Sequence, residues 1–426
     1  MKRVLFFFVF CCLLSSLSEV SFGQKWKVNY DEALVPKYTL PDPLVMSDGT
    51  AVKTAEDWVS KRRPELLALF KKEMFGQMPG VDRSKLSFKE LTSVADALGG
   101  KATRKEIRVF FDYPNQKPKI DLVIFIPNKR TGPVGAFLGW NFWGNHASFT
   151  DPGVTMTEYV DGSKTPRETY EKRRCGRSSR WAVEKVIDRG YALVTGYYEE
   201  VDPDNHDGFL NGVHPLFAKQ FPDKNAGDYP ATITAWAWGL SRALDCLETL
   251  PEINAKKVIV MGHSRLGKTS LWAGVNDTRF AGVISNDSGC GGSALSRREF
   301  GETLRVINTA FPHWFCNNFK KYIDKADTLP FDQHELIALV APRPVYIASA
   351  EQDRWADPKG EFLSALGADP VYRLLKTGGF GGVKDFPPEL NKSVGDVIRY
   401  HIRTGKHDVT DFDWDQYLNF ADKYVK

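Results

Sequence analysis

The sequence predicts an α/β protein with a mostly parallel central sheet and helices covering both of its faces. The first observation is that short apolar runs alternate with helical patterns along the chain, as in proteins built from repeated strand–helix–strand units. The second is that serine, aspartate and histidine residues stand directly after several of these runs. Because the carboxyl ends of parallel strands meet at one edge of a sheet, we expect these side chains to form a common site.

The first half of the chain begins with an arm and a helix. Residues 24–55 are rich in proline, which indicates an irregular arm on the surface, and residues 55–76 carry apolar side chains at helical spacing. The side chains of this helix that we expect to face inward are Trp58, Leu66, Leu67 and Phe70. Two alternating and two continuous apolar segments then predict four strands, at residues 106–113, 119–127, 134–141 and 191–200.

The second half repeats strands and helices to its end. Residues 232–250 predict a long buried helix, and residues 414–425 predict a closing helix. Four more strands are expected at residues 257–263, 280–287, 343–353 and 396–408.

The first 23 residues have the pattern of a secretory signal. They begin with Lys2 and Arg3, continue with an apolar run and end with small residues up to Gly23. Cleavage there would leave residues 24–426 as a single domain with an N-terminal wrapping arm. We therefore expect an exported protein, periplasmic or secreted, and no later segment is long and apolar enough to cross a membrane.

Charge and cysteine content narrow the class of protein further. A formal net charge of +4 over 426 residues is too small for a nucleic-acid-binding protein. Four cysteines remain after the signal, too few to staple so long a chain. We expect them to be mostly buried, and free or singly paired: Cys175, Cys246, Cys290 and Cys316.

The stretch from Val258 to Trp272, VIVMGHSRLGKTSLW, has the pattern of a strand, a sharp turn and a helix that presents Ser264 at the turn. In the common nucleophile elbow a glycine stands two residues after the serine. Here Leu266 takes that place and Gly267 follows it. A serine can also act simply as a helix cap. We favour a nucleophile, because candidate partners follow later strands.

A serine hydroxyl needs a neighbouring base, and the base needs a carboxylate that orients it. Asp287 and Asp353 each follow a predicted strand, and His407 follows the last one. The order serine, aspartate, histidine along the chain is that of the α/β-hydrolases. His401, inside the last strand, is the next candidate for the base, while the remaining candidates, His263 and His313, are expected to support or line the site.

Two cations follow the serine closely. Arg265 could stabilise a developing oxyanion through its backbone N–H and its guanidinium, or it could form a buried ion pair. Lys268 lies one helical turn after Ser264 and on the same face, so it could bind substrate hydroxyls, although solvated lysines are common.

Two further segments carry candidates. The loop GWNFWGNHASF, residues 139–149, follows a predicted strand where hydrolases supply a second oxyanion N–H. Its residues Asn141, Gly144, Asn145 and His146 could serve that purpose or order the loop, and both alternatives stay open. Trp355 follows Asp353 by two residues, where an indole could stack against a sugar.

Four stretches together resemble a known family. GHSRLGKTSLWAGVNDTRFAGVISNDSGCGG, GWNFWGNH, DRWADPKGEF and GKHDVTDFDW are similar to segments of carbohydrate esterase family 15, the glucuronoyl esterases, in their bacterial form. The resemblance extends from the first helix to the C-terminus. It implies an α/β-hydrolase fold, a serine–histidine–acid triad and no metal or other cofactor. The implied substrate is the ester between glucuronoyl or 4-O-methyl-glucuronoyl groups of glucuronoxylan and lignin alcohols.

The resemblance also implies roles for individual residues. The implied catalytic groups are the nucleophile Ser264, the oxyanion arginine Arg265 and the base His407. The implied substrate ligands are Lys268, Glu302 and Trp355. Many members have a glutamate at the position of Asp287, whereas others use the acid at the position of Asp353. This sequence has aspartate at both, and we expect Asp353 to be the main orienter and Asp287 a partial substitute.

Two alternatives to this function remain open at the level of the sequence. The first is another xylan esterase, which removes acetyl or feruloyl groups. The second is an inactive polysaccharide-binding homologue, which the presence of Ser264, Arg265 and His407 argues against.

Overall fold

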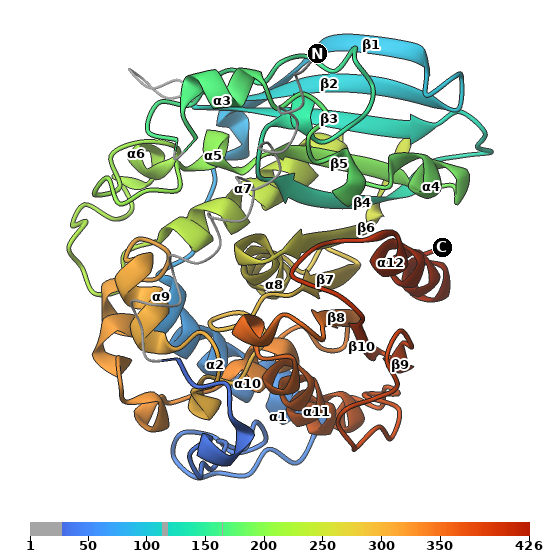
Figure 1. Ribbon diagram of the computed structural model, residues 1–426. Coiled ribbons are helices and arrows are strands. Elements are labelled where there is room, and N and C mark those ends of the chain that lie inside the picture. The colour runs from blue at the N-terminus through green and yellow to red at the C-terminus, as the bar shows by residue number, and fades with distance from the viewer. Residues whose placement is uncertain (1–27, 113–117, 164) are drawn as a thin grey trace, which may run out of the picture.

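The protein is described by a computed structural model that covers residues 28–112, 118–163 and 165–426, so the expected signal lies outside the described residues. A ten-stranded sheet forms the centre of the molecule, in the order β1-β2-β3-β5-β4-β6-β7-β8-β10-β9 (Figure 1). Its strands are β1 Leu86–Ala97, β2 Ala102–Phe111, β3 Lys119–Pro127, β4 Val134–Asn141, β5 Ala192–Tyr197, β6 Ile253–His263, β7 Gly282–Asn286, β8 Val345–Ala350, β9 Val394–Gly395 and β10 Ile398–Arg403.

Six neighbouring strands, from β5 to β10, run parallel, which confirms the predicted class of sheet. β1, β2 and β3 extend the sheet in antiparallel fashion at one end, and β9 pairs antiparallel with β10 at the other. Each parallel connection carries the chain back across a face of the sheet, so the carboxyl ends of β6, β7 and β8 lie side by side.

Helices cover both faces. They are α1 Ala55–Asp57, α2 Arg63–Phe70, α3 Arg167–Glu171, α4 Val183–Asp188, α5 Tyr198–Val201, α6 His214–Phe217, α7 Thr232–Leu247, α8 Arg265–Asn276, α9 Leu304–Ala310, α10 Gln333–Ala338, α11 Pro358–Leu374 and α12 Asp411–Tyr424. Alternate residues of β6 point into two separate cores. Val258 and Val260 pack with α7 and α8, whereas Ile259 and Met261 pack with α4 and α12.

The structure differs from the sequence prediction at three places. The predicted strand 191–200 ends at Tyr197, and the next residues form α5, which buries Glu199 and Glu200. β1 and β9 were not predicted: β1 lies at the sheet edge with most of its residues exposed or half-buried, and β9 has only two residues. The helix at residues 55–75 contains π-helical turns at Trp58–Arg62 and Lys71–Phe75, and Leu67 is only half-buried.

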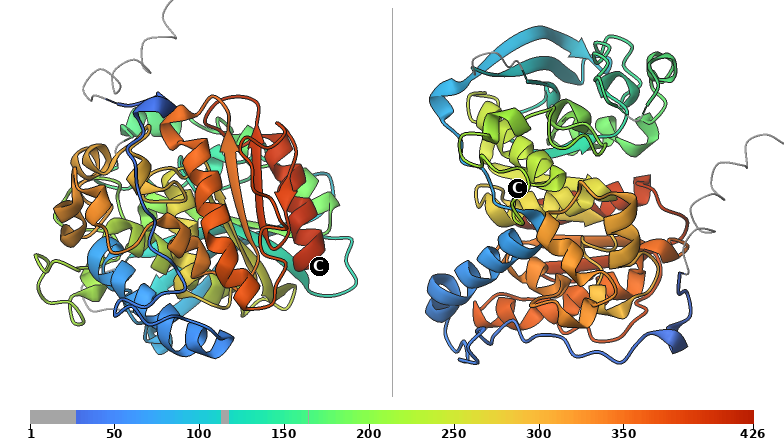
Figure 2. Two further views of the ribbon diagram at one scale, coloured as in Figure 1. Left: turned by 90° about the horizontal axis from the view of Figure 1, so that it is seen from below. Right: turned by 90° about the vertical axis from the view of Figure 1, so that its left-hand side faces the viewer.

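The N-terminal arm contacts the C-terminal half of the chain. Figure 2 shows it in blue, running along the outside of the segments coloured orange. Glu32 forms ion pairs with Arg298 and Lys359, and His334 lies 2.9 Å from the carbonyl oxygen of Pro41. These contacts fix the arm across one side of the molecule. Among the described residues, no helix is both long and apolar enough to span a membrane.

Candidate active site

Ser264 stands at a sharp turn between β6 and α8. Its backbone has φ 58° and ψ −130°, a conformation that residues other than glycine rarely adopt. The turn is so tight that a Cβ atom on Gly262 would lie 1.9 Å from the carbonyl oxygen of Leu266. The N–H of Ser264 donates to the carbonyl oxygen of Asn286, at the end of β7, over 2.9 Å. The strained turn and this bond to the neighbouring strand present the serine at the edge of the sheet.

Eight of the residues that the sequence suggested for the site line a single cavity of about 280 Å³. They are Ser264, Arg265, Lys268, Asp287, Glu302, Asp353, Trp355 and His407. Phe311 and Trp314 complete its apolar side, and sequence reasoning did not include them.

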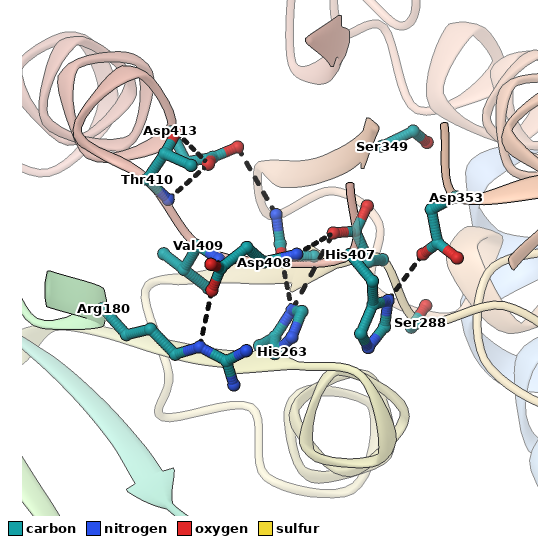
Figure 3. A network of polar contacts seen from close by, with 12 residues as sticks. Arg180, His263, Ser288, Ser349, Asp353, His407, Asp408, Val409, Thr410 and Asp413 are labelled. Carbon is teal, nitrogen blue, oxygen red and sulfur yellow. Dashed lines mark hydrogen bonds and ion pairs between the residues drawn. The ribbon is translucent and has the colours of Figure 1, made fainter. Parts of the chain in front are cut away.

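His407 is oriented by Asp353. Its Nδ1 lies 2.5 Å from Oδ2 of Asp353, and Figure 3 shows the two side chains facing each other. Asp353 is buried, whereas the imidazole is 40% exposed and open to the cavity. Since Nδ1 is taken by the carboxylate, Nε2 is the ring nitrogen that can accept a proton.

Asp287 occupies a different environment, although it lines the same cavity. Its Oδ2 lies 3.5 Å from Nη2 of Arg403 and accepts from the N–H of Asp408 over 3.3 Å. Its Oδ1 is buried and has no hydrogen-bond partner among the described residues. Burial, followed by the nearby carboxylates of Asp353 and Glu361, raises the pKa of Asp287 well above its ordinary value.

A buried ionic network holds the chain around His407. Asp413, at the start of α12, accepts from Nε of Arg403 over 2.8 Å and lies 2.9 Å from Nε2 of His401 (Figure 3 shows Asp413). His401 is fully buried and also lies 2.9 Å from the hydroxyl of Tyr346, so it points away from the cavity. The geometry therefore removes His401 as a candidate base and leaves it a structural role.

His263 packs directly beside His407. The two ring centroids lie 4.4 Å apart, as Figure 3 illustrates, and Nδ1 of His263 lies 2.5 Å from Oδ1 of Asn286. Burial, followed by the field of His407, holds the pKa of His263 well below its ordinary value. A neutral imidazole at this position supports the ring of His407 without adding a second positive charge.

Arg265 is held by a carboxylate that sequence reasoning missed. Its guanidinium pairs with the fully buried Asp204 and lies 4.7 Å from the ring centroid of Trp314. Asp204 also accepts from His313 over 2.9 Å and from Trp314 over 2.8 Å. Burial is the largest influence on the pKa of Arg265 and lowers it, but the charge and hydrogen bond of Asp204, together with Tyr198 and Glu302, outweigh burial and leave the pKa raised. No motif pointed to Asp204, because α5 and the following loop bring it to Arg265 from 61 residues away in the sequence.

Lys268 and Glu302 form a second polar group in the same cavity. Lys268 donates to the carbonyl oxygen of Ser288 over 2.6 Å, and its Nζ lies 3.6 Å from Glu302. Burial raises the pKa of Glu302, while Lys268 and a hydrogen bond with Trp355 act in the opposite direction. A buried cation, a carboxyl and an indole are groups that bind hydroxyls and stack against a sugar ring.

The loop after β4 is ordered by its own polar residues. Asn141 donates to Asn145 over 2.8 Å, Asn145 donates to the carbonyl oxygen of Asp121 over 2.8 Å, and Nε2 of His146 lies 3.2 Å from the carbonyl oxygen of Tyr170. These contacts favour the loop-ordering alternative for the three side chains.

The four cysteines are free, and three are buried while Cys175 is half-buried. For a metal ion, the best donor set in the described part of the chain is Asp287, Asp353 and His407, whose ligand atoms lie within 4.8 Å of one another. The 2.5 Å contact between Asp353 and His407 already joins two of these donors without a metal.

Comparison with known proteins places the chain in a family. A family model described as "Glucuronyl esterase, fungi" matches residues 217–376. Carbohydrate esterase MZ0003, from an unknown prokaryotic organism, is 51% identical over 412 residues, which cover 95% of this chain and 94% of that protein. A 4-O-methyl-glucuronoyl methylesterase of Wolfiporia cocos is 27% identical over 80% of this chain and 74% of its own length.

Solved structures agree with the sequence relatives. A promiscuous CE15 esterase from a marine bacterial metagenome has a TM-score of 0.85 at 51% identity, covering 93% of this chain and all of the other. A glucuronoyl esterase from Solibacter usitatus has a TM-score of 0.87 at 46% identity, covering 92% of this chain and all of the other. The chain therefore belongs to carbohydrate esterase family 15, the glucuronoyl esterases, and is a carboxylic ester hydrolase with an α/β-hydrolase fold.

Proposed function

We propose that the protein is a serine esterase that hydrolyses the ester between (4-O-methyl-)glucuronoyl groups of glucuronoxylan and lignin alcohols. The observation that carries this proposal is one cavity in which the turn at Ser264, the Asp353–His407 pair and the wall of Lys268 and Glu302 lie together. The first two supply the chemistry of ester hydrolysis, and the third supplies recognition of a sugar.

In the acylation step, Nε2 of His407 accepts the proton of the Ser264 hydroxyl while Oγ attacks the ester carbonyl carbon. Asp353 stabilises the imidazolium that forms. Arg265 stabilises the negative charge on the carbonyl oxygen, because its guanidinium is fixed in advance by Asp204 and Trp314. His407 then returns the proton to the departing alcohol, which leaves a glucuronoyl-serine ester.

Water completes the reaction by the same route. His407 takes a proton from a water molecule, the hydroxide attacks the acyl carbon, and Ser264 recovers its proton as the uronic acid leaves.

Recognition of the sugar falls to Lys268, Glu302 and Trp355. Lys268 and Glu302 are placed to bind hydroxyls of the uronate ring, and Trp355 to stack against its face. An acyl group whose carbonyl lies at Ser264 and whose ring contacts Lys268 and Trp355 must be about as large as a uronic acid. An acetyl group would leave these three side chains without a ligand.

The test compares two substrates and three variants. Wild type should hydrolyse a benzyl ester of glucuronic acid, and Ser264→Ala should lose about 10⁴–10⁶ in kcat with an unchanged fold. Lys268→Ala and Glu302→Gln should lower kcat/KM for the glucuronate ester by roughly tenfold to a hundredfold and leave p-nitrophenyl acetate nearly unaffected. If Ser264→Ala keeps a kcat within tenfold of wild type, Ser264 is not the nucleophile. Equal losses of kcat/KM on both esters would show that Lys268 and Glu302 do not bind the sugar.

We also propose that residues 1–23 are removed on export and that residues 24–426 form one domain. The proposal is supported by the sequence pattern of the first 23 residues. N-terminal sequencing of protein recovered outside the cytoplasm should give Gln24 first, whereas Met1 at the N-terminus of exported protein would contradict cleavage.

A further inference from the structure

A second cavity, of about 820 Å³, lies beside the active-site cavity. One side of it is formed by the N-terminal arm around Tyr30, and the other by residues 299–306. None of the roles assigned above uses it.

The two cavities are separated by a thin wall of two chain segments. Glu302 faces the active-site cavity, and the next residue, Thr303, lines the second one. The N–H of Glu302 donates to the carbonyl oxygen of Trp355 over 2.9 Å. A Cβ atom on Gly301 would lie 2.5 Å from the carbonyl oxygens of Arg354 and Trp355, so the two segments are in close contact. A ligand bound at Glu302 and Trp355 therefore has the second cavity next to it.

The arm is tied to this wall and presents an aromatic ring. The N–H of Gly301 donates to the carbonyl oxygen of Asn29 over 2.8 Å. The ring of Tyr30 packs edge-on against Phe300, with 6.1 Å between centroids, and the guanidinium of Arg354 lies 5.3 Å from its centroid. Tyr30 is nevertheless 38% exposed. A partly open aromatic ring held by its neighbours can stack on the apolar face of a sugar.

The polar groups of the cavity suit a neutral ligand rich in hydroxyls. Asp31 and Glu299 place two carboxylates in the lining, and carboxylates accept hydrogen bonds from hydroxyls. The positive charge of Arg305 is compensated by an ion pair with Asp324. Nδ2 of Asn29 is buried and has no hydrogen-bond partner among the described residues. Glu299 has φ 47°, a left-handed conformation that is uncommon outside glycine.

We propose that this second cavity binds pyranose units of the polysaccharide backbone that carries the glucuronoyl ester. The inference rests on the proposed function, which places the ester carbonyl at Ser264 and His407 and the uronate ring at Lys268, Glu302 and Trp355. Glu302 lines the first cavity and Thr303 the second, so the second cavity adjoins the groups that would hold the uronate ring, and the polysaccharide is attached to that ring. The backbone of the polysaccharide, not the lignin alcohol, is therefore the part of the substrate that can reach it.

The kinetic test uses the same ester on a short and a long carrier. Tyr30→Ala and Glu299→Gln are compared on benzyl glucuronate and on the benzyl ester of a glucuronoyl xylotetraose. We expect both variants to lower kcat/KM for the oligosaccharide ester about five- to twentyfold, mainly through KM, and to leave benzyl glucuronate within twofold of wild type. Tyr38→Ala is the matched control, because Tyr38 belongs to the same arm and does not line the cavity.

A binding experiment separates this inference from the proposed function. Xylotetraose is titrated into wild type and Tyr30→Ala, and the variant should bind about five- to twentyfold more weakly. This measurement needs no esterase activity, so it stands even if the protein does not cleave glucuronate esters. Equal binding of xylotetraose by both proteins, or equal losses of kcat/KM on the short and the long benzyl ester, would each overturn the inference.

Discussion

Asp353 and Asp287 follow neighbouring strands, yet their side chains contact different groups. Asp353 meets Nδ1 of His407 directly at 2.5 Å. Asp287 is directed towards Arg403 and the backbone of Asp408, and its raised pKa keeps the carboxyl group closer to the protonated form. The residue with the shorter path to the imidazole is therefore expected to orient it.

The first prediction compares the two acids by mutation. Asp353→Ala should lower kcat by about 10³–10⁴, because the imidazole loses the carboxylate that fixes its tautomer. Asp287→Ala should cost roughly tenfold, since its effect on His407 is indirect. Both kcat values are measured on benzyl glucuronate, with circular dichroism as the control for folding. A larger loss in Asp287→Ala than in Asp353→Ala would reverse the assignment.

The second prediction concerns Arg265. Arg265→Ala should lower kcat about 10²–10³-fold with little change in KM, as expected for a group that stabilises charge in the transition state. Arg265→Lys should recover little, because an ammonium group cannot reproduce both the planar contact with Trp314 and the pairing with Asp204. Steady-state kinetics of the two variants check this. An unchanged kcat with a raised KM would make Arg265 a substrate-binding residue only.

At the scale of elements, the strand–turn–helix unit of β6 and α8 positions the serine through close backbone contacts. The missing glycine of the common elbow motif does not prevent the turn, since the close approach needs a glycine at position 262 and involves only the backbone of Leu266, not its side chain. The unusual motif is therefore compatible with an ordinary nucleophile geometry.

The third prediction tests the close contact between Gly262 and the backbone of Leu266. Gly262→Ala should destabilise the protein by at least about 3 kcal/mol or prevent folding, because the new Cβ would lie 1.9 Å from the carbonyl oxygen of Leu266 and backbone cannot move aside cheaply. Gly132→Ala is the matched control, as nothing lies within 4 Å of its Cβ position. Denaturant unfolding of both variants gives the comparison. Similar stability of Gly262→Ala and wild type would show that the turn is looser than described.

At the scale of the whole molecule, α11 anchors the loop after β7 through one buried carboxyl group. Glu361 accepts from the backbone N–H groups of Ser288 and Gly289 over 2.9 Å each, and it also bonds to Ser293 and Ser349. Burial raises the pKa of Glu361 to about 7, although these hydrogen bonds act to lower it. The same loop carries Asp287, so the anchor affects the shape of the active-site cavity.

The fourth prediction follows from this pKa. In the unfolded chain a glutamate titrates at about 4.3, so between pH 5 and 7 the folded state holds a proton that the unfolded state has released. Linkage then requires that the contribution of Glu361 to stability is fully present below pH 4.3 and is lost as the pH rises through 7, by up to about 4 kcal/mol. Glu361→Gln keeps the acceptor oxygen and does not titrate. Its stability relative to wild type should therefore rise between pH 5 and pH 8.

Urea unfolding at the two pH values measures the effect, and Glu389→Gln, at an exposed position, is the control. The same change in stability with pH in wild type and Glu361→Gln would contradict the raised pKa.

The sequence, with its resemblance to a known family, was sufficient for the parallel sheet, its β6 to β8 strands and eight of the residues that line the cavity. Fully buried strands are continuous apolar runs, and the candidate catalytic residues follow them directly, so both leave a local pattern in the sequence. The edge strand β1 has a weaker sequence pattern. Most of its residues are exposed or half-buried, so it does not form an apolar run.

Contacts between distant segments were decided only by the tertiary structure. Asp204 reaches Arg265, Phe311 and Trp314 close the cavity, and the arm around Tyr30 reaches the wall beside Glu302, all without any motif in the sequence. A residue that follows a buried strand can be recognised from the apolar run that precedes it in the sequence. The partner of a buried charge depends on which loops the packing of the sheet and helices brings together, and no local pattern encodes that choice.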